Sequence, residues 1–318
     1  MPVISVIICT RNPRKNYLRR VLEALKTQTL SKENWELLLV DNASAPPLAA
    51  IWDLTWHPQA RHVREETLGL TPARLRGIAE SKGDLLVFVD DDNVLRSDYL
   101  ETACKIAADY AWLGAWSGSS IAEFEAKPPP ELKPWLVGLV VEKLTASLWG
   151  KHTMTTDACP MGAGLVLRRQ QAWHYRNLAM NDPRRKTLDR CGKQLNGGGD
   201  TDMALCGFEL GLGTGRFPEL ELTHLIPAAR LTVDYFAGIY EGFGHAGVML
   251  NAIHGKPDPF PGKIQAGILR LFLLHLFLIV SGKGRVERRI RLAMEKGRMR
   301  AQTELKRVGY WQNKPSHS

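Results

Sequence analysis

The sequence predicts an α/β fold with a mostly parallel central sheet. Apolar stretches at 3–9 and 35–40 are separated by residues 16–28, where apolar side chains recur at helical spacing. This strand, helix, strand order is typical of parallel sheets. A further apolar stretch at 85–89 shows no polar face, as expected of a parallel strand that is covered by helices on both sides.

The alternation continues to about residue 250. We expect a short strand at 61–64, a helix at 71–81, a helix that is capped by Ser97 and runs to about Tyr110, and a strand at 162–167. A helix at 200–210, an extended segment at 219–225 and a helix at 232–250 should follow. The prolines at 128–130 and 134 argue against regular structure there. Residues 181–199 form a polar, glycine-ended stretch of the kind that closes over ligands.

All of the net positive charge lies at the end of the chain. The 318 residues have a formal net charge of +9, yet residues 263–318 alone carry 13 Lys and Arg against 3 Asp and Glu. No basic stripe is left in the main part to neutralise phosphates, so we expect no nucleic-acid partner. Five cysteines without CxxC spacing, and a first segment that resembles a strand more than a signal peptide, favour reduced thiols and a cytoplasmic location.

The C-terminal part combines an apolar stretch with a basic helix. Residues 264–280 are mostly apolar, but Gln265, Arg270 and His275 interrupt them, leaving fewer than the ~20 residues that a spanning helix needs. The basic residues that follow fit one face of an amphipathic helix. We expect a peripheral element on an anionic membrane surface at the cytoplasmic side. The alternative is a helix that packs on the main domain with a solvated basic face.

Three consecutive carboxylates, Asp90, Asp91 and Asp92, follow the strand at 85–89. At the C-terminal end of a parallel strand they would lie at the mouth of a ligand crevice. Three like charges in such a place are costly unless a cation offsets them, which predicts a divalent metal site. The alternative is an acidic turn that helps to cap the next helix.

Six segments, taken in order, resemble motifs of the inverting glycosyltransferases of family 2, which have the Rossmann-like GT-A fold of nucleotide-diphospho-sugar transferases. They are Val-Ile-Ile-Cys-Thr-Arg-Asn at 6–12, Leu-Leu-Val-Asp-Asn-Ala-Ser at 38–44, Gly-Leu-Thr-Pro-Ala-Arg-Leu-Arg-Gly-Ile at 69–78, the Gly-Asp start and Val-Asp-Asp-Asp end of 83–92, Gly-Ala-Gly-Leu-Val-Leu-Arg-Arg at 162–169 and Gly-Gly-Asp-Thr-Asp at 198–202. The resemblance implies a GT-A catalytic domain at 1–255, with a nucleotide-binding half at about 1–110 and an acceptor half at about 111–255. A helical, basic extension at 256–318 would follow.

The acidic triplet matches the Asp-x-Asp (DXD) element of this family through Asp90 and Asp92. The resemblance implies Mn²⁺ or Mg²⁺ held against the diphosphate of the donor. Asp92 is expected to be the closer ligand, and Asp90 to reach the metal or the ribose. Asp91 is grouped with the donor-binding residues, although on an extended chain it would point the other way. His224 falls where some GT-A enzymes supply a further metal ligand; a packed or solvent-facing role is the alternative.

Asp200 matches the catalytic base of the family. An inverting transfer needs a carboxylate that takes the proton from the incoming hydroxyl group. The family usually has Glu before this Asp, where this chain has Gly199, so a register with Asp202 as the base stays open. Helix capping is the alternative role and is compatible with catalysis. The acceptor-binding residues implied are Gly162, Ala163, Gly164 and Asp202.

The ends of the first two strands and the helix at 71–81 match donor contacts. The residues implied are Thr10, Asn12, Asp41, Asn42 and Arg74. Family members that read uracil often carry a carboxylate at the position of Asn42, so UDP-, dTDP- and GDP-sugars stay open as donors. The alternatives are an Asx-type turn for Asn42 and a solvated surface position for Arg74.

The function that the resemblance implies is a metal-dependent, inverting hexosyl transfer from a nucleotide sugar to a glycan or lipid-linked acceptor, in polysaccharide or cell-surface glycan biosynthesis. One alternative is a sugar-phosphate nucleotidyltransferase, but residues 10–13 lack the Gly-rich basic signature of that class. The other is a non-catalytic nucleotide-binding protein of the membrane surface.

Overall fold

The computed structural model describes residues 3–151, 157–192, 194–256 and 265–307. By its internal contacts the chain divides into two units. Unit 1 comprises Met1–Lys127, Leu139–Lys186 and Gly199–Pro227, and unit 2 comprises Pro128–Gly138, Thr187–Gly198 and Ala228–Ser318. These units are defined by contacts alone, so the functional division into a catalytic domain at 1–255 and an extension at 256–318 stays a prediction.

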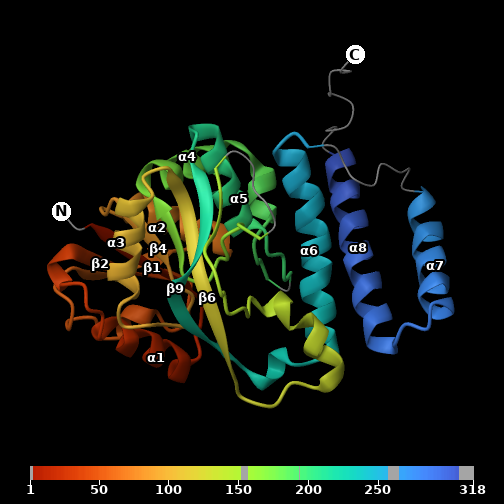
Figure 1. Ribbon diagram of the computed structural model, residues 1–318, viewed down its shortest axis with the longest axis horizontal. Coiled ribbons are helices and arrows are strands. Elements are labelled where there is room, and N and C mark those ends of the chain that lie inside the picture. Colours follow the sequence, from red (N-terminus) through yellow and green to blue (C-terminus); the bar gives the residue numbers. More distant parts are fainter. Residues whose placement is uncertain (1–2, 152–156, 193, 257–264, 308–318) are drawn as a thin grey trace. The chain divides into compact units, whose positions relative to one another are not determined.

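The described strands of unit 1 form one mixed sheet (Figure 1). They are β1 (Ile4–Thr10), β2 (Trp35–Asn42), β3 (Ala60–Glu65), β4 (Leu85–Phe88), β5 (Asn93–Leu95), β6 (Leu113–Phe124), β7 (Leu148–Gly150), β8 (Leu165–Arg168) and β9 (Gly213–Ile226). Their order is β3-β2-β1-β4-β8-β6-β9-β5, with β7 paired to β9. The first four strands are parallel. β8 is antiparallel to both of its neighbours and β6 is parallel to β9, so the second half of the sheet is mixed.

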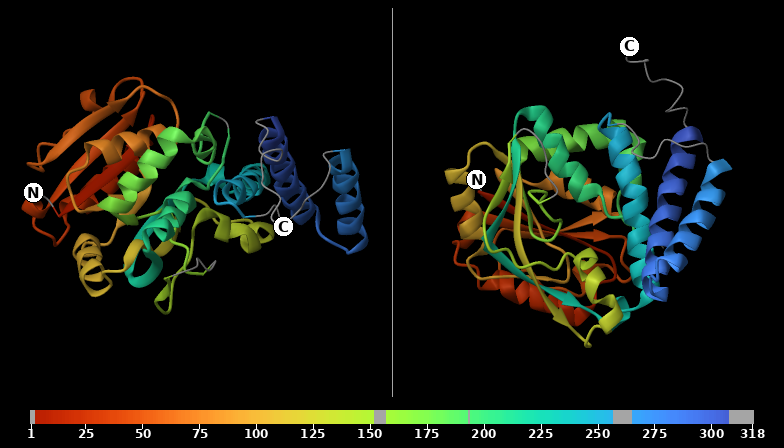
Figure 2. Two further views of the ribbon diagram at one scale, coloured as in Figure 1. Left: turned by 90° about the horizontal axis from the view of Figure 1, so that it is seen from above. Right: turned by 45° about the vertical axis from the view of Figure 1, so that its right-hand side comes forward.

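Helices cover both faces of this sheet (Figure 2). They are α1 (Lys15–Lys26), α2 (Leu70–Glu80), α3 (Tyr99–Asp109), α4 (Arg169–Asn181) and α5 (Gly199–Leu205). Ile4, Val6 and Ile8 of β1 pack in one core with apolar side chains of α1 and α3, whereas Ile7 packs in a second core with those of α2 and α4. The two-residue period of a strand sends alternate side chains to opposite faces. This explains why β1 carries apolar side chains on both of its faces.

Some elements of the structure differ from those expected. β6 and α4 were not predicted, and α3 begins at Tyr99 after Asp98, so Ser97 does not cap it. The proline-rich segment was expected to lack regular structure, but it contains the 3-10 helix η3 (Pro130–Leu139) with Pro134 inside it. Pro134 has no backbone N–H and therefore donates no hydrogen bond within this helix. The other 3-10 helices are η1 (Lys32–Asn34), η2 (Leu48–Ala50), η4 (Pro183–Thr187), η5 (Cys206–Leu210) and η6 (Ala228–Arg230).

Three helices dominate unit 2: α6 (Val233–Ile253), α7 (Gln265–Val280) and α8 (Arg285–Arg307). α6 and α8 approach each other closely at two glycines, since a Cβ atom on Gly297 would lie 1.8 Å from the carbonyl oxygen of Glu241, and one on Gly244 would lie 2.0 Å from that of Met294. The basic helix α8 is therefore tightly packed along α6. None of the described helices is both long enough and apolar enough to cross a bilayer.

Candidate active site

The acidic triplet forms a turn between β4 and β5. The backbone N–H of Asn93 donates to the carbonyl of Asp90 (3.1 Å), and that of Leu225 on β9 donates to the carbonyl of Asp92 (2.8 Å). The extended chain that would point Asp91 away from its neighbours is therefore not present. The turn instead holds all three carboxylates beside the C-terminal ends of the parallel strands.

Asp91 and Thr10 join this turn to the end of β1. The Thr10 hydroxyl donates a hydrogen bond to the Asp91 carboxylate. Thr10 is itself paired in register with Asp41 of β2. The polar residues that end β1, β2 and β4 thus meet at one edge of the sheet, as expected for neighbouring parallel strands.

Asp92 and His224 form a buried pair. Nε2 of His224 lies 3.6 Å from Oδ2 of Asp92, and both side chains are less than a tenth exposed. Oδ1 of Asp92 accepts a hydrogen bond from Nδ2 of Asn93 (3.1 Å), which the β5–β9 register sets opposite His224. The distance to His224 is too long for a direct hydrogen bond. A carboxylate and an imidazole held side by side in this way are suitable ligands for a divalent cation.

Asp90 does not complete a three-ligand cluster with this pair. In the part of the chain that the structure describes, no three His, Cys, Asp or Glu side chains are grouped so as to hold a metal ion. Mg²⁺ in phosphate-handling sites is commonly held by one or two carboxylates together with the phosphates of the substrate. The residues present fit a site of that kind, with Asp92 and His224 as the protein ligands.

Asp41 is engaged by the loop that follows β2. Its Oδ1 accepts from the backbone N–H of Ser44 (2.9 Å), and its Oδ2 accepts from the N–H of Leu48 (2.9 Å) and from Arg64 (2.6 Å). Burial alone raises the pKa of the Asp41 carboxyl, but these hydrogen bonds outweigh burial and lower the pKa below its usual range. Asp41 thus fixes the loop, and its contact with the donor stays a prediction.

Asn42 holds the loop that leads into α2. Its Nδ2 donates to the carbonyls of Glu65 (3.2 Å) and Thr67 (2.7 Å), and its Oδ1 accepts from the N–H of Gly69 (2.9 Å). The side chain is buried, so the protein itself uses both ends of the amide. This arrangement supports a structural role similar to the Asx-type alternative.

Asn12 has an exposed, left-handed backbone position with φ of 48°. Its backbone N–H donates to the Ser44 hydroxyl (2.9 Å), and its Oδ1 accepts from the N–H of Ala45 (3.0 Å). Asparagine tolerates this conformation better than most residues do. Asn12 therefore links the loop after β1 to the loop after β2, beside the predicted donor site.

Arg74 is buried on α2, with 5% of its surface exposed. The alternative of a solvated surface position is therefore wrong for Arg74. The next arginine on the helix, Arg76, is exposed and pairs with Glu80 (3.0 Å), as expected from its place on the helix. A buried guanidinium on α2 is consistent with a role at the nucleotide, which stays a prediction.

Asp200 lies at the start of α5, against Gly162. A Cβ atom on Gly162 would lie 2.6 Å from Oδ2 of Asp200. The other carboxylate oxygen, Oδ1, accepts a hydrogen bond from the N–H of Thr201 (2.8 Å). The side chain is partly exposed. The predicted base and the predicted acceptor segment are therefore adjacent, although they lie far apart in the sequence.

Asp202 is fully buried in an ion pair with Arg185. Nη1 of Arg185 lies 2.5 Å from Oδ1 of Asp202. Burial lowers the pKa of Arg185, but the neighbouring Asp202 and Cys206 outweigh burial and raise it. A carboxylate in this position could not meet an acceptor without breaking a buried pair. The structure therefore supports neither the acceptor-binding role predicted for Asp202 nor the register in which it is the base.

The glycines of the acceptor segment have separate structural reasons. Gly164 has φ of 69°, and a Cβ atom there would lie 2.3 Å from the hydroxyl of Tyr99. That hydroxyl donates to the carbonyl of Gly164 (2.6 Å), and burial raises the pKa of Tyr99. Ala163 is buried in the core between the two glycines. Gly162 leaves space for the Asp200 carboxylate, whereas Gly164 is needed for the fold.

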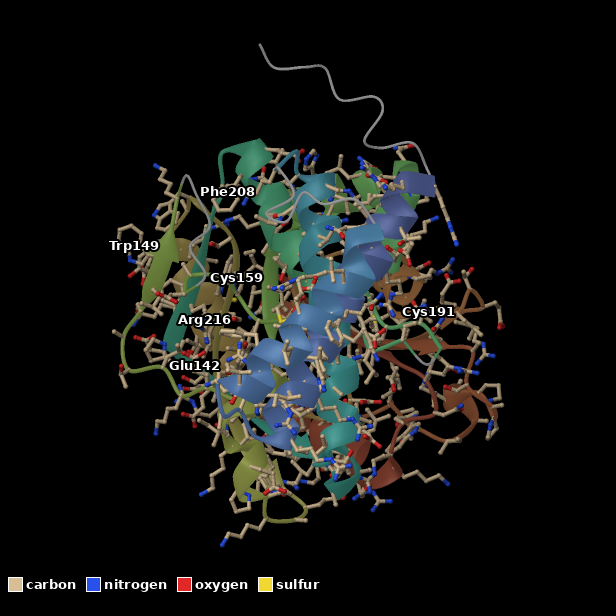
Figure 3. All side chains as sticks on the ribbon, turned by 90° about the vertical axis from the view of Figure 1, so that its right-hand side faces the viewer. Glu142, Trp149, Cys159, Cys191, Phe208 and Arg216 are labelled. Carbon is tan, nitrogen blue, oxygen red and sulfur yellow. The ribbon has the colours of Figure 1, made fainter. Side chains whose placement is uncertain are left out.

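Sequence reasoning missed a buried cation near Asp200. Arg216 of β9 is 4% exposed and pairs with Glu142 (2.9 Å). Burial raises the pKa of the Cys159 thiol to about 11, and the charge of Asp200 adds to this, whereas Arg216 lowers it. Figure 3 shows Cys159, Arg216 and Glu142 near one another in unit 1. The only sequence signal was an arginine flanked by small and apolar residues, Gly215 and Phe217, near the start of β9.

The fold agrees with the GT-A architecture that the sequence resemblance implies. A parallel half whose strand ends carry an acidic turn is joined to a mixed half that carries a carboxylate at a helix start. Residues 5–149 match a family model described as glycosyl transferase family 2. This match confirms the resemblance to the family for the four motifs that lie within the segment, at 6–12, 38–44, 69–78 and 83–92.

Known proteins resemble parts of this chain. EpsH of Bacillus subtilis is 26% identical over 165 residues, which are 47% of this chain and 46% of EpsH. The glucosyl-dolichyl phosphate glucuronosyltransferase of Haloferax volcanii is 26% identical over 141 residues, which are 42% of this chain and 44% of the relative. The chain thus spans less than half the length of these curated relatives.

A solved structure supports the fold over most of the chain. The crystal structure of S. aureus TarS 1–349 superposes with a TM-score of 0.50 and 12% sequence identity, covering 97% of this chain and 92% of that one. At this identity the likeness concerns the fold alone. It agrees with the GT-A architecture read from the strand order.

Proposed function

We propose that the protein transfers a sugar from a nucleotide-sugar donor to a hydroxyl group of a glycan or lipid-linked acceptor, with inversion at the anomeric carbon. The observation that carries this proposal is the contact between Asp200 and Gly162, in a chain whose residues 5–149 match the family 2 glycosyl transferase model. The family match gives no support to the alternative of a sugar-phosphate nucleotidyltransferase.

The donor end of the site is assigned to the edge where β1, β2 and β4 terminate. Thr10, Asn12 and the loops held by Asp41 and Asn42 would surround the nucleoside, with a UDP-, dTDP- or GDP-sugar as the donor. Arg74 would approach the same region from α2.

Asp92 and His224 would hold Mn²⁺ or Mg²⁺, and Asp90 would reach the metal or the ribose. When bound, such an ion offsets the charge that develops on the departing diphosphate. The half-exposed Asp90 and Asp91 leave the acidic turn open to solvent on one side, which suits entry of a charged donor. His224 is buried and would stay in place as the donor binds and leaves.

Asp200 would act as the general base. As the acceptor hydroxyl oxygen forms its bond to the anomeric carbon, the proton of that hydroxyl passes to Asp200, and the bond between the anomeric carbon and the diphosphate oxygen breaks. The nucleoside diphosphate leaves with the bonding electrons. The hydrogen bond from Thr201 orients the carboxylate, and the small Gly162 leaves space for it.

The acceptor is proposed to be a glycan or a lipid-linked sugar. The Haloferax volcanii relative is named for a transfer to glucosyl-dolichyl phosphate, a lipid-linked acceptor. Polysaccharide or cell-surface glycan biosynthesis is the setting that fits such a transfer.

We also propose that α7 and α8 attach the protein to an anionic membrane surface. α7 exposes large apolar side chains, among them Phe272 (63%), Phe277 (65%) and Val280 (80%). The basic side chains of α8 follow directly in the sequence, and the combination suits an interfacial element that inserts apolar residues beside acidic headgroups.

The test of transfer separates donor binding from chemistry. Thermal unfolding is followed with UDP, dTDP, GDP and CMP, each with and without Mn²⁺, for wild type and Asp200→Asn. One nucleotide should raise the melting temperature of both proteins equally, since Asp200 does not hold the donor. Transfer to acceptor should fall by several orders of magnitude in Asp200→Asn only. Unchanged transfer would remove Asp200 from the mechanism.

The test of membrane attachment is co-sedimentation with vesicles that contain phosphatidylglycerol. The double variant Phe272→Glu, Phe277→Glu should lose binding, whereas a matched change on unit 1, Leu68→Glu at another exposed apolar position, should not. Equal binding of the three proteins would exclude α7 as the attachment element.

A further inference from the structure

Arg216 is a buried charge in unit 1 for which the proposed transfer gives no role. Its guanidinium contacts Glu142 (2.9 Å), the carbonyl of Asp157 at a long 3.4 Å and the sulfur of Met161 at 3.7 Å. Its Nε atom is buried and has no hydrogen-bond partner among the described residues. Buried charges are normally fully hydrogen-bonded, because an unsatisfied donor on a buried cation is costly. The guanidinium therefore has unused capacity to bind an anion.

Glu142 is a partner that could be displaced. Its backbone N–H and carbonyl each bond to Ser120 of β6 at 2.9 Å, which fixes the main chain. Its side chain, however, is 41% exposed, whereas that of Arg216 is 5% exposed. An ion pair with one exposed member contributes little, because water competes for the carboxylate. Rotation of Glu142 toward solvent would open Arg216 to a ligand.

The segment that precedes Gly162 connects Arg216 with Asp200. Met161 contacts the guanidinium, and the next residue, Gly162, lies against the Asp200 carboxylate. The charge of Asp200 raises the pKa of the Cys159 thiol and that of Arg216 lowers it, so both residues act on the same thiol. Figure 3 labels Cys159, Arg216 and Glu142 on the same side of the view. Arg216 therefore lies on the acceptor side of the proposed base.

We propose that Arg216 binds an anionic group of the acceptor, a phosphate or a carboxylate, and that Glu142 takes the place of this group when no acceptor is bound. A guanidinium can donate two parallel hydrogen bonds to either group, which a neutral sugar cannot match. The hydroxyl to be glycosylated would then belong to a neighbouring part of the same molecule. The inference rests on the proposed function only in calling the ligand an acceptor; the binding itself requires no transfer.

The two members of the pair give opposite expectations. Methyl phosphate and acetate are titrated calorimetrically into wild type, Arg216→Gln, Arg216→Lys and Glu142→Gln, with EDTA present to keep metal ions out of the donor site. Arg216→Gln should bind the preferred anion about tenfold more weakly. Arg216→Lys should recover part of the loss, because lysine keeps the positive charge but cannot donate two parallel hydrogen bonds. Glu142→Gln should bind several-fold more tightly, since the competing carboxylate is gone.

A matched control is Glu123→Gln, which removes the carboxylate of an exposed ion pair with Arg20 and should leave anion binding unchanged. If the ion pair only stabilises the fold, removing either member should lower anion affinity. An affinity loss in Glu142→Gln equal to that in Arg216→Gln would therefore overturn the proposal. Equal binding by wild type and Arg216→Gln would also overturn it. If Arg216→Gln does not fold, the sign of the Glu142→Gln effect decides alone.

A second pair of titrations distinguishes a lipid phosphate from a soluble phosphate as the ligand. Vesicles of phosphatidylcholine with and without phosphatidic acid are offered to wild type and Arg216→Lys. A gain from phosphatidic acid that depends on Arg216 marks a lipid phosphate, and binding of methyl phosphate alone marks a soluble one; both support the site. If Asp200→Asn loses transfer but Arg216→Gln binds anions as wild type does, the proposed function stands and this inference is rejected.

Discussion

The carboxylate of Asp200 lies so close to Gly162 that a methyl group on this glycine would come within 2.6 Å of its Oδ2 atom. The contact joins the start of α5 to the segment that leads into β8, and it leaves the carboxylate little freedom on that side. Position 162 thus controls the direction of the proposed base without contributing any polar atom.

Gly162→Ala should lower transfer strongly while the protein stays folded. The added Cβ must push the carboxylate away, and a displacement of about 1 Å can cost about 100-fold in rate. Nucleotide binding should be unchanged, because the donor end of the site is not touched. The measurements are kcat and the melting shift given by the nucleotide.

The control is Gly247→Ala, a glycine with nothing within 4 Å of its added Cβ, inside the helix α6. It should leave transfer unchanged and raise stability by about 0.5–1 kcal/mol, because alanine is the better helix former. A Gly162→Ala variant as active as Gly247→Ala would show that the Asp200 position is not set by this contact.

Breaking the pair of Arg185 and Asp202 should unfold the protein more readily, in contrast to changes at Asp200. Asp202→Asn leaves the Arg185 guanidinium buried without its counter-charge, which typically costs about 3–5 kcal/mol. Asp200→Asn removes a partly exposed carboxylate and should change the free energy of unfolding by less than about 1 kcal/mol. Urea unfolding of the two variants measures the difference, and similar losses would contradict the assignment of separate roles.

The sequence was sufficient to predict the parallel half of unit 1. In that half β1, β2 and β4 are largely apolar stretches, and polar residues stand at or directly after their C-terminal ends, so the expected strands agree with the structure. The position of the three carboxylates at the end of β4 was predicted, but the turn that their backbone forms was not. Asp91 was expected on an extended chain, and the turn that brings it to Thr10 depends on a backbone bond from β9, far away in the sequence.

The mixed half was harder to predict because its strands lack an apolar pattern. β6 contains Ser117 and Ser119, which are buried because their hydroxyls accept hydrogen bonds from the backbone N–H groups of Met161 and Leu144. Such polar residues mimic a loop in the sequence. Likewise, nothing local distinguishes Asp200 from Asp202, since only the distant Arg185 decides which carboxylate is buried.

Acid should reduce the contribution of Asp41 to stability. The hydrogen bonds to Asp41 lower its pKa in the folded state, so the unfolded chain binds the proton more readily. The stabilisation is therefore complete above the unfolded pKa of about 3.9 and is lost as the pH falls through the lower folded value. The stability difference between wild type and Asp41→Asn should shrink between pH 7 and pH 3 in urea unfolding. A difference that stays constant would show that the charge of Asp41 does not contribute.

Gly297→Ala should weaken the packing of α8 on α6 within unit 2. Its Cβ would lie 1.8 Å from the backbone carbonyl of Glu241, which cannot move without shifting the helix. Overpacking of this kind typically costs about 1–3 kcal/mol. Limited proteolysis should cleave α8 faster in this variant than in Gly247→Ala. Equal rates would indicate that the two helices are held mainly by other contacts.

Removal of His224 should weaken metal binding even though Asp90 and Asp92 remain. His224 is buried beside Asp92, and no third His, Cys, Asp or Glu completes a cluster in the described part of the chain. If these two are the protein ligands, as proposed, the loss of one of them should be severe. Free Mn²⁺ measured by electron paramagnetic resonance should show at least about tenfold weaker binding in His224→Gln with nucleotide present, and no detectable binding in Asp92→Asn. The control His174→Gln removes a surface histidine paired with Glu209 and should bind as wild type does. Wild-type affinity in His224→Gln would assign the metal to the carboxylates alone and leave His224 as a packed residue.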